Sequence, residues 1–280
     1  KAPTISPTLT GTTTVDKISF TTNNTITGLD TFTANTTGSY NTAYGTEILK
    51  NNTSGVYNVG VGVFSLRDNT VGTRNTAVGS STLRKNTTAD YNTATGNYAL
   101  FNTTTGGYNT ATGADALYNN STGARNTAIG YYALRQNSSG SYNTGIGFNS
   151  NSSSVTATGQ VTLGDANVTS LRCNDTSISS LSDVRDKTDI IDSPYGLDFI
   201  NTIQPKQYKW QTREGNIKDG STRIGFIAQE LLEACQGEND KLELVMEDNP
   251  DRLEAKYGNL LPIMVQAIKD LTARIEELEA

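Results

Sequence analysis

The chain of 280 residues contains no histidine at all. Without an imidazole it cannot build a His-dependent catalytic triad, the common zinc sites or a His-based proton shuttle. Only two cysteines are present, Cys173 and Cys235, which are too few for a disulfide framework, so we expect two reduced thiols. Any acid–base chemistry in this protein must therefore use other side chains.

Long apolar segments are also missing. No run of 18 or more apolar residues occurs, so we expect no membrane insertion. The chain begins at Lys1 without a starting Met and without the basic-then-apolar order of a signal peptide. We therefore expect it to be a fragment whose N-terminal part is missing, with enough length for more than one domain.

Charge is distributed unevenly along the chain. Residues 1–181 carry 10 Lys and Arg against 8 Asp and Glu, a net charge of +2. Residues 182–280 carry 12 against 20, a net charge of −8. Neither part has the basic stripe that is typical of nucleic-acid binding, so we expect no nucleic-acid partner.

The first part of the chain repeats itself with a strict 17-residue period. Each of eight units begins with a variant of Asn-Thr-Ala-x-Gly, and their first residues are Asn24, Asn41, Asn58, Asn75, Asn92, Asn109, Asn126 and Asn143. Glycine follows four places later in all eight units, and leucine eight places later in six of them, from Leu49 to Leu134. From the second unit onward, the residue before the Asn is Tyr, or else Arg74 or Arg125.

This period suits one coil of a β-solenoid, because so short a unit cannot hold a helical hairpin. We predict an all-β solenoid or β-roll shaft over residues 24–157, after an N-terminal segment, 1–23, of a truncated fibre. Each unit would form a strand through its Asn-Thr-Ala-x-Gly motif and a second short element, either a strand or a helical turn. The pattern resembles the head repeats of trimeric autotransporter adhesins and, more closely, the repeats of phage tail-fibre shafts.

The repeated Asn and Thr residues allow more than one role. Stacked Asn side chains can bind calcium or sugar, but aspartates at fixed offsets are missing, which favours a structural role in satisfying turn backbone. One Thr per coil is also not the paired flat array of an ice-binding surface. We therefore expect no cofactor and no metal site.

After residue 157 the repeat decays, and a polar junction, 158–181, leads into ordinary globular sequence at 182–280. Apolar spacing and turn residues in this part predict a helix at 194–203, strands at 206–210 and 222–228, a short helix at 228–235, and a strand with a turn at 242–251. These elements indicate an α+β domain that is separate from the shaft.

The last segment, 259–280, has the clearest helical pattern. Asn259 is a plausible N-cap, and Pro262 falls in the first turn, where its missing N–H has little effect. Apolar residues then recur in steps of three and four: Leu261, Met264, Ile268, Leu271, Ile275 and Leu278. Such a seam belongs either to a helix packed on its own domain or to a coiled coil between chains, and the flanking charges favour the coiled coil.

Four motifs occur in order in this domain: SDVRDKTDI from residue 182, YKW at 208–210, GFIAQEL at 225–231 and AIKDLTARIEELE at 267–279. Together they resemble the self-cleaving intramolecular chaperone domain of phage endosialidases and tail fibres, which also occurs in the myelin regulatory factor family. The resemblance implies a homotrimer in which this domain folds the upstream fibre and then cuts itself off. On this chain it implies Ser182 as nucleophile, Lys187 as general base and Leu181–Ser182 as the bond that is cut.

This chemistry is reasonable for these residues, because a serine hydroxyl needs a base and a desolvated lysine can serve in a chain without histidine. A free lysine has a pKa of ~10.4, so about one in 2,500 is neutral at pH 7 unless burial lowers that pKa. The Oγ of Ser182 would attack the carbonyl of Leu181 and form an ester that water hydrolyses. The charged residues before the lysine form either a local salt-bridge set, which we favour, or a device that positions the lysine: Asp183, Arg185 and Asp186.

Together with these resemblances, the sequence implies a phage tail-fibre or tailspike fragment for host attachment, found in the virion and folded in the host bacterial cytoplasm. Its C-terminal domain would be a single-turnover autocatalytic serine endopeptidase without activity on external substrates. Its partners would be two further copies of the chain and a bacterial surface receptor or glycan. The alternative is a bacterial trimeric surface adhesin that uses the same assembly module.

Overall fold

The computed structural model describes residues 18–19, 23–168, 170–172, 182–209, 220 and 222–280. Two compact units divide the chain, Lys1–Asp165 and Ala166–Ala280. The residues named from the sequence that lie outside the described residues are Lys1, Cys173, Leu181 and Trp210.

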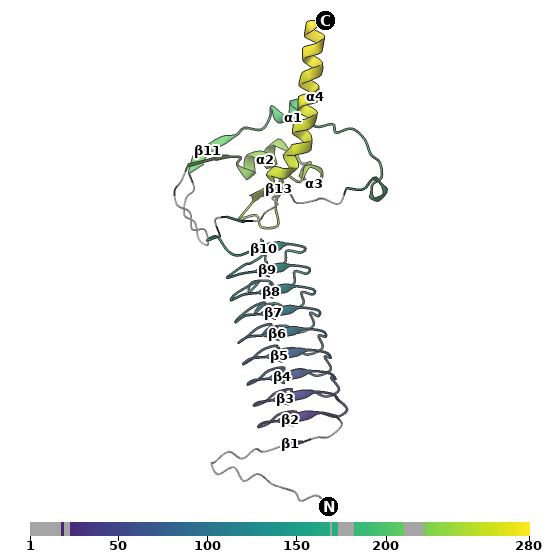
Figure 1. The fold of residues 1–280 in the computed structure, drawn as a ribbon, viewed down its shortest axis with the longest axis vertical. Coiled ribbons are helices and arrows are strands. Elements are labelled where there is room, and N and C mark those ends of the chain that lie inside the picture. Colours follow the sequence, from purple (N-terminus) through teal and green to yellow (C-terminus); the bar gives the residue numbers. More distant parts are fainter. Residues whose placement is uncertain (1–17, 20–22, 169, 173–181, 210–219, 221) are drawn as a thin grey trace, which may run out of the picture. The chain divides into compact units, whose positions relative to one another are not determined.

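The first unit is a β-solenoid whose coils each contribute one short strand (Figure 1). Its parallel strands are β2 (Thr25–Thr27), β3 (Thr42–Tyr44), β4 (Val59–Val61), β5 (Thr76–Val78), β6 (Thr93–Thr95), β7 (Thr110–Thr112), β8 (Thr127–Ile129), β9 (Thr144–Ile146) and β10 (Val161–Leu163). At the N-terminal edge, β1 (Ile18–Ser19) pairs antiparallel with β2. Register partners such as Thr76 and Thr93 lie exactly one repeat apart in the sequence, so the solenoid predicted from the period is confirmed.

Strand pairing continues past residue 157, where the sequence analysis ended the repeats. Strand β10 pairs in parallel with β9, and Gln160 stands where the repeat would place an Asn. The backbone N–H of Gln160 donates to Oδ1 of Asn143 over 3.0 Å, as the Asn of a regular coil does. One further, less regular coil therefore follows the eight, and the domain limits stay a prediction.

The second element of each coil is a turn, neither strand nor helix. In the second coil, Glu47 and Leu49 have φ angles of 52° and 47°, in the left-handed region. The N–H of Leu49 donates to the carbonyl of Ser65, one coil on, over 3.3 Å, and the N–H of Asn52 donates back to Leu49 over 3.1 Å. Hydrogen bonds between coils thus continue around this corner, which settles the question that the sequence left open.

A narrow apolar core runs through the shaft. The six Leu residues from Leu49 to Leu134 are fully buried, and small residues such as Ala77 fill the strand side. Where Gly60 takes the place of the Ala, an added Cβ would lie 2.4 Å from Cγ2 of Ile48. The pairing of the large Ile48 with the small Gly60 is not shared by the neighbouring coils. It therefore helps to define which coil stacks on which.

The glycine at the end of each strand is required by the close approach of the next coil. Gly96 has a φ of +134°, which residues with a side chain rarely adopt. An added Cβ at this position would lie 2.5 Å from the carbonyl oxygen of Gly113. The motif therefore ends in Gly because both the backbone angle and the space exclude a side chain.

The second unit is a small α+β domain. Its elements are η1 (Val184–Asp186), α1 (Leu197–Ile200), β11 (Lys206–Lys209), β12 (Thr222–Gly225), α2 (Ala228–Ala234), α3 (Asn239–Leu242), β13 (Val245–Met246), β14 (Glu254–Ala255), η2 (Tyr257–Asn259) and α4 (Leu260–Glu279). Antiparallel pairs form between β11 and β12 and between β13 and β14. The α+β class and the final helix predicted from the sequence are confirmed.

The core of this unit is apolar and joins elements that are far apart in sequence: Phe199, Ile203, Leu231, Cys235, Leu242, Leu244, Val245, Leu260 and Ile263. Polar contacts also connect α1 to α4, since the carboxylate of Asp270 accepts the N–H of Leu197 over 2.9 Å. That bond holds the pKa of Asp270 below its usual value, with further help from Gln266. An ion pair of 3.1 Å between Arg274 and Asp198 adds a second link.

Asn259 occupies the N-cap position of α4, as expected, but its side chain makes no capping hydrogen bond. Its Nδ2 instead donates to the carbonyl of Glu243 over 2.9 Å. Pro262 does lie in the first turn. Among the residues described, no helix is long and apolar enough to cross a membrane.

Candidate functional site

Residues 182–187 form one tight turn. Asp183 caps η1, with its Oδ1 accepting the backbone N–H of Arg185 over 2.9 Å. The N–H groups of Asp186 and Lys187 donate to the carbonyls of Asp183 and Val184, both over 3.2 Å. These consecutive 3₁₀-type bonds reverse the chain, so that a residue and the fifth residue after it come together.

The two residues that meet across this turn are Ser182 and Lys187. The Nζ of Lys187 donates a hydrogen bond to the Oγ of Ser182. With Nζ as the donor, this bond shows that the two atoms are adjacent; a neutral Lys187 acting as a base would instead accept the hydroxyl proton. The structure thus brings the predicted pair into contact, while their catalytic roles stay a prediction and Leu181 lies outside the described residues.

The turn is also stabilised by an ion pair between Arg185 and Asp183. The guanidinium of Arg185 donates from Nε to Oδ1 of Asp183 over 3.0 Å, and from Nη2 to Oδ2 over 2.6 Å. These hydrogen bonds, with the backbone N–H of Arg185, hold the pKa of Asp183 below its ordinary value. These hydrogen bonds stabilise the turn fully at pH values above the ordinary pKa of an aspartate. The stabilisation is lost as the pH falls through the lowered pKa of Asp183. Because the two residues bond to each other and to the turn backbone, the structural role is favoured.

Every residue from 182 to 194 is exposed in the single chain. Three of them are large apolar residues, with exposed fractions of 67% for Val184, 64% for Ile190 and 81% for Ile191. The Ser182–Lys187 contact therefore lies on the surface of one chain, outside its apolar core.

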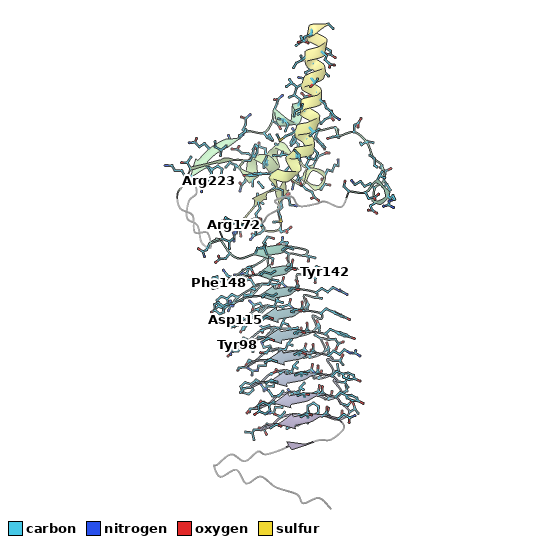
Figure 2. All side chains as sticks on the ribbon, in the orientation of Figure 1. Tyr98, Asp115, Tyr142, Phe148, Arg172 and Arg223 are labelled. Carbon is cyan, nitrogen blue, oxygen red and sulfur yellow. The ribbon has the colours of Figure 1, made fainter. Side chains whose placement is uncertain are left out.

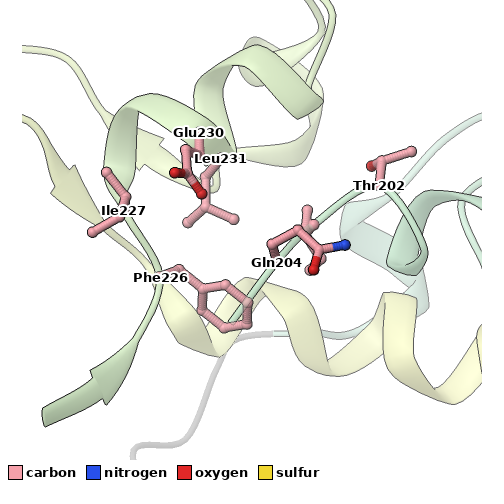
Figure 3. A pocket seen from close by; sticks show the side chains of 7 residues that line it. Thr202, Gln204, Phe226, Ile227, Glu230 and Leu231 are labelled. Carbon is pink, nitrogen blue, oxygen red and sulfur yellow. The ribbon is translucent and has the colours of Figure 1, made fainter. Parts of the chain in front are cut away.

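A small cavity lies elsewhere in this unit (Figure 3). Its volume is ≈ 30 Å³, and Phe226 and Ile227, just before α2, line it together with Glu230 and Leu231 of that helix. Residues after α1, among them Gln204, form the facing wall. The cavity is too small to receive a peptide or sugar.

Helix α4 carries two apolar stripes that are offset by one residue. One stripe, Leu260, Ile263 and Ala267, is buried in the helix's own domain. The other is the predicted seam, whose side chains are 47% to 87% exposed: Leu261, Met264, Ile268, Leu271, Ile275 and Leu278. The helix therefore packs on its own domain without using the seam, which leaves the seam available. The sequence analysis missed the first stripe, although its steps of three and four were visible.

The first Asn of each coil serves the backbone. Oδ1 of Asn92 accepts the N–H of Asn109, one coil on, over 2.9 Å, and its Nδ2 donates to the carbonyl of Gly106 over 3.0 Å. All eight residues of this column are buried. Both halves of the amide are thus engaged, as the structural interpretation predicted. Within the described part of the chain, no group of three or more His, Cys, Asp or Glu residues could hold a metal ion.

A second Asn column was missed from the sequence: Asn35, Asn52, Asn69, Asn86, Asn120 and Asn137. In an intact step, Nδ2 of Asn69 donates to Oδ1 of Asn52 over 2.8 Å. Thr103 occupies the place where the period calls for an Asn, and its buried Oγ1 and the buried Oδ1 of Asn86 have no hydrogen-bond partner. The regular spacing of the repeat would have revealed both the column and its interruption.

The residues that precede the Asn form a third column: Tyr40, Tyr57, Arg74, Tyr91, Tyr108, Arg125 and Tyr142. The rings of Tyr91 and Tyr108 stack at 4.8 Å with 7° between their planes, and Arg74 lies 5.2 Å from the ring centre of Tyr91. Tyr142 lies at one edge of the coils in Figure 2, and Tyr98 at the other. Since the ring faces are covered by one another, this column offers edges rather than faces to a ligand.

Comparison with known families gives one match. Residues 182–239 match the model of a peptidase family that is described as the chaperone of endosialidase. The match begins at Ser182 and reaches the first residue of α3. Comparisons with curated proteins and with solved structures give no match. The chain thus combines a chaperone-of-endosialidase region with an upstream β-solenoid, as the resemblance predicted.

Proposed function

We propose that this combination makes the chain part of a phage tail fibre or tailspike that attaches to a bacterial host. Three chains would trimerise through the C-terminal domain, which assists folding of the shaft and then removes itself between Leu181 and Ser182. The observation that carries the proposal is the family match, because it begins at the serine that would become the new N-terminus.

The proposed cut uses two steps. Neutral Lys187 takes the proton from Oγ of Ser182, which attacks the carbonyl carbon of Leu181. As the C–O ester bond forms, the peptide C–N bond breaks and the proton passes to the amine of Ser182. One water then hydrolyses the ester, leaving a carboxylate on Leu181 and restoring the hydroxyl. The contact between Nζ of Lys187 and Oγ of Ser182 supports this assignment, because it brings the two atoms within reach of a proton transfer.

Assembly would complete the site. In the single chain, the turn and the apolar side chains of Val184, Ile190 and Ile191 are exposed. A neighbouring chain that covers them would also desolvate Lys187, and burial favours the neutral form of a lysine. The cut would then follow trimer formation, after the C-terminal domain has assisted folding of the shaft.

The exposed seam of α4 supports trimer formation. Its six residues keep the steps of a heptad repeat, and none is needed for packing against the helix's own domain. A helix of 20 residues is marginal as an isolated coil, so the globular part would contribute to the contact.

A repetitive shaft has a specific need for such a domain. Coils that are nearly identical can dock one coil out of register, and three chains multiply the number of wrong pairings. Pairing between distant segments is also slow. A C-terminal trimeriser would align the three chains before the coils form.

The test is the intact mass of freshly expressed protein. We expect a C-terminal fragment that begins with Ser182, and no cleavage in Ser182→Ala. Lys187→Arg keeps the positive charge but cannot act as a base, so it should also stay uncut. Ser193→Ala, in the same exposed segment, should be cut like the wild type. The uncut variants should still form trimers by native mass spectrometry.

Complete cleavage of Ser182→Ala would exclude Ser182 as the nucleophile. Complete cleavage of Lys187→Arg would exclude Lys187 as the base. A monomeric Ser182→Ala protein would instead count against the chaperone role, so the two parts of the proposal can fail separately.

A further inference from the structure

One side of the shaft is formed by the outward residues of the strands. In β5, the middle residue Ala77 is buried, whereas Thr76 is partly exposed and Val78 is exposed. The other coils follow the same pattern, with the middle residue inward. We call the outward first and third strand residues of β2 to β9, together with the residue after the following Gly, the strand face.

The strand face carries no charge. From the first Asn of each unit to the residue after its Gly, none of the eight units contains Asp, Glu, Lys or Arg. All charged residues between positions 24 and 157 fall elsewhere in the repeat: Asp30, Glu47, Lys50, Arg67, Asp68, Arg74, Arg84, Lys85, Asp90, Asp115, Arg125 and Arg135. No charge therefore falls between the first Asn and the residue after the Gly in any of the eight units, and the next position carries Asp30, Glu47 and Asp115.

Large apolar side chains are exposed on this uncharged face: Leu29, Tyr44, Val63, Val78, Ile129, Tyr131, Ile146 and Phe148. Their exposed fractions run from 37% for Val78 to 63% for Tyr44. Between them lie uncharged polar residues such as Thr95 and Thr112. Exposed apolar residues that gather on one side usually mark a surface that is covered in the functional state.

We propose that the strand face of the shaft is the surface that packs against a second copy of the chain. In a trimer, only residues next to the three-fold axis meet their own equivalents, so a column of charges placed there would repel itself. An uncharged, partly apolar face avoids that repulsion. This inference rests on the proposed trimer and assigns the side of the shaft through which the chains meet.

The other exposed columns fit this role less well. The tyrosine column contains Arg74 and Arg125, which would face like charges around an axis. The column that contains Val71, 13 places after the Asn, is otherwise hydroxyl residues such as Thr105 and Thr122. The strand face alone combines freedom from charge with many large apolar residues among the described coils.

Paired cysteine variants test the proposal in the full chain, with Ser182→Ala to keep the chaperone attached and Cys173→Ser to remove one native thiol. Val78→Cys lies on the strand face, and Val71→Cys is its control; the wild-type side chains are 37% and 44% exposed. A short bifunctional maleimide should join two of the three Val78→Cys chains of each trimer into a covalent dimer, because each chain offers one accessible thiol and Cys235 is buried. Val71→Cys should stay monomeric on a denaturing gel. Ile129→Cys and Thr122→Cys repeat the comparison farther along the shaft, should Val78→Cys fail to fold.

Native mass of the same samples separates the failures. If the protein is a trimer but the control cysteines cross-link, or no cysteine cross-links, then the strand face is not the interface. Either result leaves the proposed function intact. A monomer overturns both, because no second copy is present to cover the face. Cross-linking between shafts should not depend on protein concentration, since the copies already belong to one trimer.

Discussion

The shaft and the C-terminal unit use their residues in opposite ways. In the shaft, a bond such as that between Asn92 and Asn109 recurs one coil later between Asn109 and Asn126. In the C-terminal unit, contacts such as that between Leu197 and Asp270 join distant parts of the sequence and occur once. Repeated contacts extend the shaft coil by coil. The contacts of the C-terminal unit occur once each and build one fold that carries one Ser182–Lys187 site.

The interiors differ in the same sense. The shaft buries columns of Asn beside a thin core of Ala and Leu, so its stability depends largely on the hydrogen bonds of these buried amides. The C-terminal unit buries an apolar cluster, so its stability depends on packing. Substitutions should therefore change stability mainly through hydrogen bonding in the shaft and mainly through packing in the C-terminal unit.

The largest effect should come from the backbone of the shaft. Gly96→Val forces a Cβ to within 2.5 Å of the Gly113 carbonyl at a φ of +134°. We expect a loss of more than about 3 kcal/mol in the free energy of unfolding, or no folded shaft at all. Thr105→Val, at an exposed position of the same unit, should change it by less than about 0.5 kcal/mol. Denaturant unfolding followed by circular dichroism measures both, and equal tolerance would contradict the stacked coils.

A second prediction separates the two stripes of α4. Ile263 is 4% exposed and Ile268 is 63% exposed, although both are isoleucines of one helix. Ile263→Ala should lower the free energy of unfolding of the C-terminal unit by about 2–4 kcal/mol. Ile268→Ala should leave that fold intact and weaken association. Unfolding curves and sedimentation velocity of the uncut protein report the two effects, and the reverse result would mean that the seam is not an interface.

The smallest effect should come from repairing the interrupted Asn column. Thr103→Asn supplies a donor for Oδ1 of Asn86, which is buried without a partner. We expect a gain of about 1 kcal/mol in the free energy of unfolding. Thr105→Asn, on the surface nearby, controls for a general effect of Asn and should change little. A loss of stability in Thr103→Asn would show that the column does not tolerate an Asn at this level.

Most of the shaft could be predicted because its evidence is repeated. Eight copies of the motif gave the strands, the positions of Gly96 and its equivalents, and the buried Leu residues without any knowledge of distant contacts. What the period could not predict was the path after each strand. Leu49 and its equivalents adopt left-handed angles there, because each coil must turn back so that its N–H groups meet the next coil.

The candidate site was predictable from motifs rather than from spacing. A serine and a lysine five residues apart are common in sequences, and only the surrounding motifs singled out Ser182 and Lys187. The contact between them depends on η1 and on the cap from Asp183, which place the two side chains together.

The sequence by itself determined that the coils repeat with a fixed period, that a different, α+β unit follows them, and that α4 carries heptad spacing. Only the tertiary structure decided which stripe of α4 is buried. Leu260 and Leu261 both begin a series with steps of three and four, so local spacing cannot tell them apart. Leu260 turns inward because Phe199 and Leu231, far away in sequence, form the surface on which it packs. Whether a helix residue is buried depends on contacts with residues that are distant in sequence, and the local spacing of apolar residues does not predict those contacts.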